Sequence, residues 1–172
     1  MSLENCIRTT YSKLKEQNDL APNSVINKLL TDFVHELSTA QENGNTEVAD
    51  CKYLQQERLD LPILCGQAEC EMEKYWAREF LKKQDLTPES LKEFWYYENY
   101  AALWETEHNL MSPYLKNKRL VFLGSGALPL TIILASLNSA YFKAICVDYD
   151  SEAVALSSSL IEHLNLQEQI QV

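Results

Sequence analysis

The order of short elements between residues 119 and 150 constrains the fold of this 172-residue chain more than any other feature. An apolar run, Leu120–Leu123, stops at Gly124-Ser125-Gly126 and is followed by an apolar helical pattern over 129–137. The run Phe142–Asp148 then predicts a second strand that ends in an acid. Strand, glycine turn, helix and acid-tipped strand are typical of a βαβ unit in a nucleotide-binding α/β fold.

The sequence predicts only the first part of such a sheet. A helical pattern covers 152–164, and Ile170-Gln171-Val172 indicates the start of a third strand. Folds of this type usually have about six or seven strands. We therefore expect residues 117–172 to form a truncated Rossmann-like domain whose C-terminal half is absent. Its open edge at residues 170–172 would allow two copies of the chain to pair as a homo-oligomer.

Helical periodicity dominates the preceding residues. Apolar residues recur at helical spacing over Leu3–Leu14 and over Ile26–Leu37, the second time after the start signal Pro22-Asn23-Ser24. The segment 39–46 contains Gln, Asn and Gly and is expected to be a loop. The sequence therefore predicts an N-terminal helical bundle over residues 1–116.

Two prolines mark boundaries later in this helical region. A third helical pattern begins near Val48 and meets Pro62, which forces a kink or a new helix start because proline lacks the N–H. Thr87-Pro88-Glu89 is a strong start signal, with a capping hydroxyl, a proline and an acid facing the helix dipole. The aromatic run Phe94–Tyr97 follows, and helical spacing continues to about Tyr114.

The charge balance excludes several classes of partner. The formal net charge is −10, so the phosphates of nucleic acid or anionic lipid would repel the surface. The longest apolar run, Leu128–Leu137, is shorter than the roughly 18 residues that span a bilayer. The first ten residues lack the basic start and apolar stretch of a signal peptide. We expect a cytoplasmic protein that binds neither nucleic acid nor membrane.

Cysteine and histidine usage argues against a metal centre. The cysteines form no CxxC pair, and the three histidines are scattered. A zinc site needs clustered ligands at motif spacing. We therefore expect no bound metal, and thiols that are reduced and partly buried. The five cysteines are Cys6, Cys51, Cys65, Cys70 and Cys146.

The glycine turn and Asp148 indicate the kind of ligand. Glycine has no Cβ, so the backbone passes close to a ligand, and an acid at the next strand tip suits ribose hydroxyls. Pro129 replaces the third glycine of a dinucleotide fingerprint, which weakens the case for a pyrophosphate. S-adenosylmethionine (SAM) contains no phosphate, so the pattern favours SAM over NAD. The alternative is a βαβ unit that binds no ligand.

Two segments of this half resemble the nicotianamine synthase family: GSGALPLTIILAS (124–136) and VDYDSEA (147–153). The tripeptide Pro129-Leu130-Thr131 has no general role in nucleotide-binding folds, which makes the resemblance specific. The resemblance implies a SAM-binding domain like that of class I methyltransferases. Its implied cofactor-binding residues are Gly124, Ser125, Gly126, Pro129, Leu130, Thr131, Asp148 and Asp150.

The helical half resembles the same family. Ile63–Glu73 is similar to its CG-x-AE-x-x-x-E motif, and Phe94–Tyr100 is similar to its YY-x-NY motif. In the family reaction an amine attacks the γ-carbon of the aminobutanoate arm of SAM, and methylthioadenosine leaves. The resemblance thus implies transfer of a 3-amino-3-carboxypropyl group to a small amine or amino acid. The product would be nicotianamine or a related metal-chelating metabolite, such as a metallophore.

This chemistry gives roles to two acids. A protonated amine is a poor nucleophile, so a base must remove a proton. Glu69 and Glu73 are four residues apart on one helix face, where partial screening from water would raise a carboxylate pKa. We expect Glu69 to be the first candidate for the base and Glu73 the second. A solvated acidic face is the alternative, although Gly66 and Ala68 suggest close packing or a pocket.

Four polar side chains complete the candidate site. Tyr96, Tyr97 and Tyr100 offer hydroxyls to the acceptor and π faces to the sulfonium, and we do not rank them. Asn99 offers its NH₂ group to an α-carboxylate. Ordinary core packing is the alternative for the aromatic run. Two other functions stay open, a SAM-dependent methyltransferase and a non-catalytic SAM-binding protein.

Overall fold

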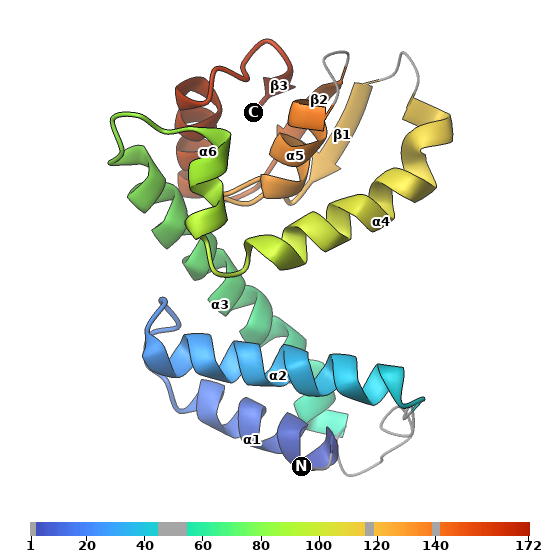
Figure 1. The fold of residues 1–172 in the computed structure, drawn as a ribbon. Coiled ribbons are helices and arrows are strands. Elements are labelled where there is room, and N and C mark those ends of the chain that lie inside the picture. Colours follow the sequence, from blue (N-terminus) through green and yellow to red (C-terminus); the bar gives the residue numbers. More distant parts are fainter. Residues whose placement is uncertain (1–2, 45–54, 116–118, 139–141) are drawn as a thin grey trace. The chain divides into compact units, whose positions relative to one another are not determined.

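The computed structural model describes residues 3–44, 55–115, 119–138 and 142–172. The chain divides into two compact units, Met1–Met72 and Glu73–Val172, and helix α3 passes through the division. The order of helices and strands is drawn in Figure 1. The predicted domain boundary, between residues 116 and 117, lies outside the described residues and stays a prediction.

The first unit is helical. It contains α1 (Leu3–Lys15), α2 (Ser24–Glu42) and the first part of α3 (Gln55–Leu81). Helices α1 and α2 pack side by side, with apolar side chains of both helices buried (Figure 1). Polar contacts join α1 to α3, since Arg8 Nη1 lies 2.8 Å from Glu57 Oε1 and the Tyr11 hydroxyl donates to Asp60 Oδ2.

Helix α2 begins as predicted and ends later than predicted. The Asn23 side chain accepts the N–H groups of Val25 and Ile26, which caps the helix. The expectation of a loop from residue 39 is wrong, because α2 continues to Glu42. Gly44 then adopts a left-handed conformation with φ of +67°, which ends the helix without the strain that a Cβ would add.

Helix α3 narrows two expectations that each left two alternatives open. Pro62 lies inside it, so this proline does not begin a new helix, and the alternative of a kink is the one that stays. A Cβ built on Gly66 would meet no atom within 4 Å, so Gly66 is not a point of close packing, whereas Ala68 is fully buried. The predicted start of the helix near Val48 lies outside the described residues, as does Cys51.

The second unit contains a parallel sheet, which confirms the α/β class. Strands β1 (Arg119–Leu123), β2 (Lys143–Val147) and β3 (Ile170–Gln171) lie in the order β1-β2-β3, joined by α5 (Leu130–Asn138) and α6 (Ser151–His163). Right-handed crossovers in one direction place both helices on the same face of the sheet. Helix α5 contacts the sheet at β3, and Figure 1 shows it beside the three strands.

Two further helical segments precede the sheet. The Thr87 signal begins a 3-10 helix, η3 (Pro88–Glu93), in which Thr87 and Ser90 form a capping box. The chain is extended at Phe94, and α4 (Tyr97–Leu115) follows. The buried ring of Trp104 on α4 meets the Phe142 ring edge-on at 6.4 Å, so α4 packs at the start of β2. No helix among the described residues is long and apolar enough to span a membrane.

Candidate functional site

The site is built where β1 and β2 end. The N–H groups of Gly124 and Ser125 both donate to the Val147 carbonyl, at 2.8 and 3.2 Å. Gly124 and Gly126 have φ of +71° and +67°, a conformation that glycine adopts without the steric penalty of a Cβ. The sequence GSG therefore folds into a tight turn fixed to the end of the neighbouring strand.

Asp148 connects this turn to the one after β2. Its Oδ2 accepts the Gly126 N–H at 2.8 Å, and its Oδ1 accepts the Asp150 N–H at 2.9 Å. Each carboxylate oxygen has a second lone pair, so Asp148 keeps acceptor capacity for a ligand hydroxyl. The predicted acid thus lies beside the predicted glycine turn, where it also holds both turns in place.

The two amide contacts make Asp148 important for stability without any ligand. Replacing it with alanine leaves two backbone N–H groups without this acceptor, and we expect the free energy of unfolding to fall by about 1–3 kcal/mol. Urea denaturation followed by tryptophan fluorescence measures this change. Asp148→Asn keeps one oxygen and should lose less. A loss below about 0.5 kcal/mol, typical of an exposed surface position, would contradict this role.

Glu73 rests directly on the glycine turn. A Cβ built on Gly126 would lie 1.9 Å from Glu73 Oε2, so the carboxylate occupies the space that any other residue would fill. The Tyr100 hydroxyl donates to Glu73 Oε1 at 2.6 Å. The structure therefore brings three of the predicted site residues together: one glycine, one acid and one tyrosine.

Small side chains allow this approach. Ala77, one helical turn after Glu73, is fully buried in a cluster with Ala127 and Ala153, and Leu156 packs against it. Alanine at these positions lets α3 approach the turn and α6 closely. Because Glu73 precedes Ala77 by one turn and Gly126 precedes Ala127, the same packing places the carboxylate on the glycine.

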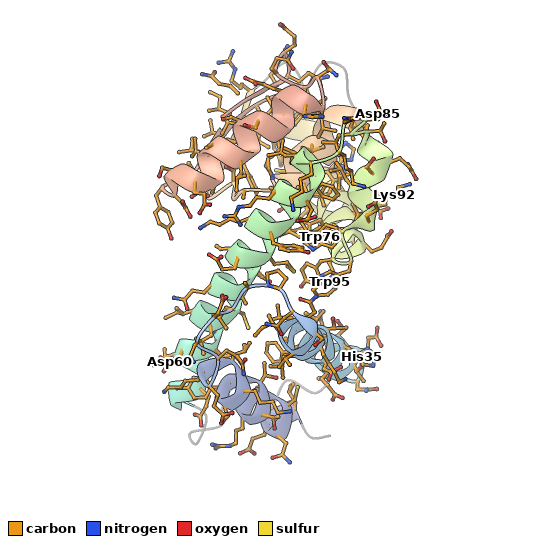
Figure 2. All side chains as sticks on the ribbon, turned by 90° about the vertical axis from the view of Figure 1, so that its left-hand side faces the viewer. His35, Asp60, Trp76, Asp85, Lys92 and Trp95 are labelled. Atoms are coloured by element: carbon orange, nitrogen blue, oxygen red, sulfur yellow. The ribbon has the colours of Figure 1, made fainter. Side chains whose placement is uncertain are left out.

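The aromatic run belongs partly to the core and partly to the site. The Phe94 ring is buried, and its centroid lies 5.6 Å from that of the Trp76 ring and 5.9 Å from that of the Tyr100 ring. Tyr96 meets Tyr100 edge-on at 5.9 Å. Figure 2 shows Trp76 on α3 and Trp95 beyond η3. The rings pack as a core would, while the Tyr100 hydroxyl reaches the acid.

Two predicted residues on α4 have other surroundings. Burial raises the pKa of Tyr97, which the nearby Lys92 ammonium partly opposes. Asn99 is exposed. The structure thus distinguishes the tyrosines that the sequence alone left unranked. Tyr100 donates a hydrogen bond to Glu73, and the Tyr96 ring contacts the Tyr100 ring. The roles of Tyr97 and Asn99 stay predictions.

The segment after the turn is buried. Pro129 directly precedes α5, and Leu130 and Thr131 are its first residues; the Ile133 N–H donates to the Pro129 carbonyl. Their side chains are buried, and their contact with a cofactor stays a prediction. Ser125 is also buried, and its hydroxyl oxygen has no hydrogen-bond partner among the described residues. Burial raises the pKa of the Cys146 thiol to about 11.

Asp150 has structural partners. Its side chain accepts the Glu152 and Ala153 N–H groups, which caps α6, and its Oδ2 lies 2.6 Å from Lys74 Nζ. The Lys74 ammonium holds the pKa of Asp150 below its usual range. Arg78 pairs with Glu152. Lys74 and Arg78 were not among the predicted site residues. Their spacing of four residues, on the helix that carries Glu73, is the sequence signal that could have found them.

Glu69 lies on α3 in the first unit, four residues before Glu73. It is half-buried, and burial raises its pKa. Burial also raises the pKa of Cys65 to about 11, and the negative charge of Glu69 adds to the shift. The expected effect on the Glu69 carboxylate is therefore present, and its part in a reaction stays a prediction.

The raised pKa of Glu69 predicts that the free energy of unfolding depends on pH. The native state keeps a proton that the unfolded state loses as the pH rises past the ordinary value of 4.5, so stability falls with rising pH in that window. Glu69→Gln removes this loss. We expect the free energy of unfolding of the variant, relative to the wild type, to increase between about pH 4 and about pH 7. Urea unfolding at both pH values measures it, and an unchanged difference would contradict the shift.

Comparison with known proteins gives a consistent family. The family model described as nicotianamine synthase protein matches residues 3–171. The chain is 31% identical over 157 residues to a nicotianamine synthase of Solanum lycopersicum and 33% identical over 156 residues to nicotianamine synthase 3 of Arabidopsis thaliana. Each alignment covers 88% of this chain and 48% of the relative. The chain thus spans about half the length of these relatives.

Solved structures show the same fold. A crystal structure of MtNAS in complex with MTA and tNA superposes with a TM-score of 0.80 at 24% identity, covering 98% of this chain and 64% of that one. A glutamate-to-glutamine variant of MtNAS in complex with S-adenosylmethionine gives a TM-score of 0.74 at 23% identity, with 98% and 63% covered. Among the described residues, no group of three or more His, Cys, Asp and Glu is arranged to hold a metal ion.

Proposed function

The chain belongs to the nicotianamine synthase family, and from this premise we propose that it transfers the aminobutanoate group of SAM to an amine, with release of methylthioadenosine. The observation that carries the proposal is the Glu73 carboxylate, which rests on the Gly126 backbone and accepts the Tyr100 hydroxyl. An acid held at a nucleotide-binding turn lies where a cationic group of the donor or acceptor would need it.

The residues around the turn fit SAM as the donor. A Cβ at Gly124 would meet nothing within 4 Å, so the backbone there is open to a ligand. Asp148 has acceptor capacity for ribose hydroxyls. Similar structures are described as complexes with S-adenosylmethionine and with MTA. When bound, SAM would supply the electrophilic γ-carbon beside its sulfonium.

We propose that Glu73 holds the acceptor ammonium in line with the γ-carbon and takes up its proton. The Tyr100 hydrogen bond fixes the orientation of the carboxylate. Positioning is the larger effect, because it can lower the activation barrier by up to about 7–11 kcal/mol. General-base catalysis contributes a factor of about 10²–10⁴ in rate, which corresponds to about 3–5 kcal/mol. The π faces of Tyr96 and Tyr100 would stabilise the sulfonium nearby.

The other candidate residues have subordinate roles in this proposal. Glu69 would serve as a second carboxylate along α3, and its raised pKa suits a group that exchanges a proton. Tyr97 and Asn99 would contact the acceptor. We propose Asp150 as a support of the turn more than as a ribose ligand, because it caps α6 and pairs with Lys74.

The acceptor would be a second aminobutanoate unit or an amino acid. The plant relatives are named nicotianamine synthases, which favours nicotianamine over a bacterial metallophore as the product. Amines and carboxylates of such a product would bind transition metals. One further proposal comes from the sequence, a cytoplasmic location.

The by-product tests the proposed reaction. Incubation of the chain with SAM and candidate amines should yield methylthioadenosine, and mass spectrometry of the mixture identifies it. A SAM-dependent methyltransferase would yield S-adenosylhomocysteine instead, and that product alone would refute the proposal. SAM binding without either by-product would favour the non-catalytic alternative.

A further inference from the structure

Lys74 joins α3 to the start of α6. Its Nζ lies 2.6 Å from Asp150 Oδ2 and 3.4 Å from Glu152 Oε2, and its side chain is only 12% exposed. One helical turn later, Arg78 pairs with Glu152. Two cations of one helix thus contact two acids at the N-terminus of another.

Without its acidic partners, the Lys74 ammonium would be unfavourable at the N-terminus of α6. A helix N-terminus carries partial positive charge, which repels an ammonium, and burial costs Lys74 hydration and side-chain freedom. The acids offset this cost, so the net stabilisation is small while the geometry is closely defined. The ion pair therefore fixes the placement of α3 more than it adds stability.

The same stretch of α3 carries the acid of the site. Glu73 directly precedes Lys74, and Ala77 packs with Ala127 beside the glycine turn. A rotation or slide of α3 would therefore move the Lys74 ammonium from Asp150 and the Glu73 carboxylate from Gly126 together. Asp150 in turn lies next to the turn because its own N–H donates to Asp148.

We infer that Lys74 is a positioning residue: its ion pair with Asp150 fixes α3 on α6 and thereby holds the Glu73 carboxylate over Gly126. Its consequence for catalysis rests on the proposed function. A displacement of about 1 Å in a catalytic group lowers turnover by up to about a hundredfold.

Lys74→Met and Asp150→Asn test the inference in the full 172-residue chain. Methionine keeps the stem of Lys74 without its charge, and asparagine keeps the helix cap without the charge of Asp150. We expect each variant to shift the Gly126 amide resonance and lower kcat about ten- to hundredfold, with KM for SAM within about twofold. The double variant should resemble either single one, because each residue acts through the other.

Two variants serve as controls. Lys74→Arg keeps the charge and should retain the wild-type Gly126 resonance. Lys82→Met removes an exposed lysine that pairs with Glu79, and it should leave both readouts unchanged. A folded Lys74→Met chain with an unchanged Gly126 resonance would overturn the inference, as would strictly additive effects. If Lys74→Met does not fold, the same comparison is made with Asp150→Asn.

The Gly126 amide resonance tests the positioning role of Lys74 independently of the proposed reaction. A shifted Gly126 amide in a chain whose wild type releases no methylthioadenosine would refute the reaction and keep the positioning role. An unshifted amide with normal release would do the reverse.

Discussion

Glu73→Gln is expected to lower methylthioadenosine release by about 10²–10⁴-fold while SAM binding stays within about twofold. Glutamine has nearly the same shape, and its amide oxygen still accepts the Tyr100 hydroxyl. It lacks the negative charge that attracts an ammonium and the basic oxygen that takes a proton. The loss therefore falls on the reaction step. Product release at saturating SAM and calorimetric SAM binding measure the two quantities.

The matched variant is Glu69→Gln, which changes the same group one helical turn earlier. If Glu73 is the acid that acts on the amine, Glu69→Gln should cost less than about tenfold in turnover. The sequence alone placed Glu69 first, so a larger loss at Glu69 than at Glu73 would support that order. It would then contradict the role that we propose for the Glu73 contact.

The sequence predicted the sheet because local signals there agree. Strand formers, a glycine turn and an acid stand in βαβ order, and the parallel strands follow within a residue or so of the expected bounds. Helix ends were less predictable. The loop expected from residue 39 rested on composition, whereas α2 ends only where Gly44 adopts a positive φ. An isolated glycine is also tolerated inside a helix, so the residue type alone does not mark the helix end.

The candidate site was predictable as a set of residues but not as an arrangement. Motif spacing indicated Glu73, Tyr100 and Gly126 separately, although Gly126 follows Glu73 only after 53 residues. Their contact depends on Ala77 and its small neighbours, which no motif marks as functional. Lys74 illustrates the same limit, because a lysine on a helix is usually a solvated side chain. Only packing shows that this one is nearly buried.

Gly126→Ala is expected to destabilise the chain by about 1–2 kcal/mol and to reduce transfer about a hundredfold or more. The first effect is backbone strain, since φ is +67°. The second follows from the methyl group, which would lie 1.9 Å from Glu73 Oε2. A carboxylate at the end of a flexible side chain moves aside at little steric cost. The move nevertheless takes it away from the turn and from the Tyr100 hydroxyl.

Gly124→Ala separates these effects. Its φ of +71° brings similar strain, but its Cβ would meet nothing within 4 Å. Both variants should therefore lose similar stability in urea unfolding, while only Gly126→Ala displaces the acid. Equal loss of turnover in both variants would show that the contact between Gly126 and Glu73 has no part in the reaction.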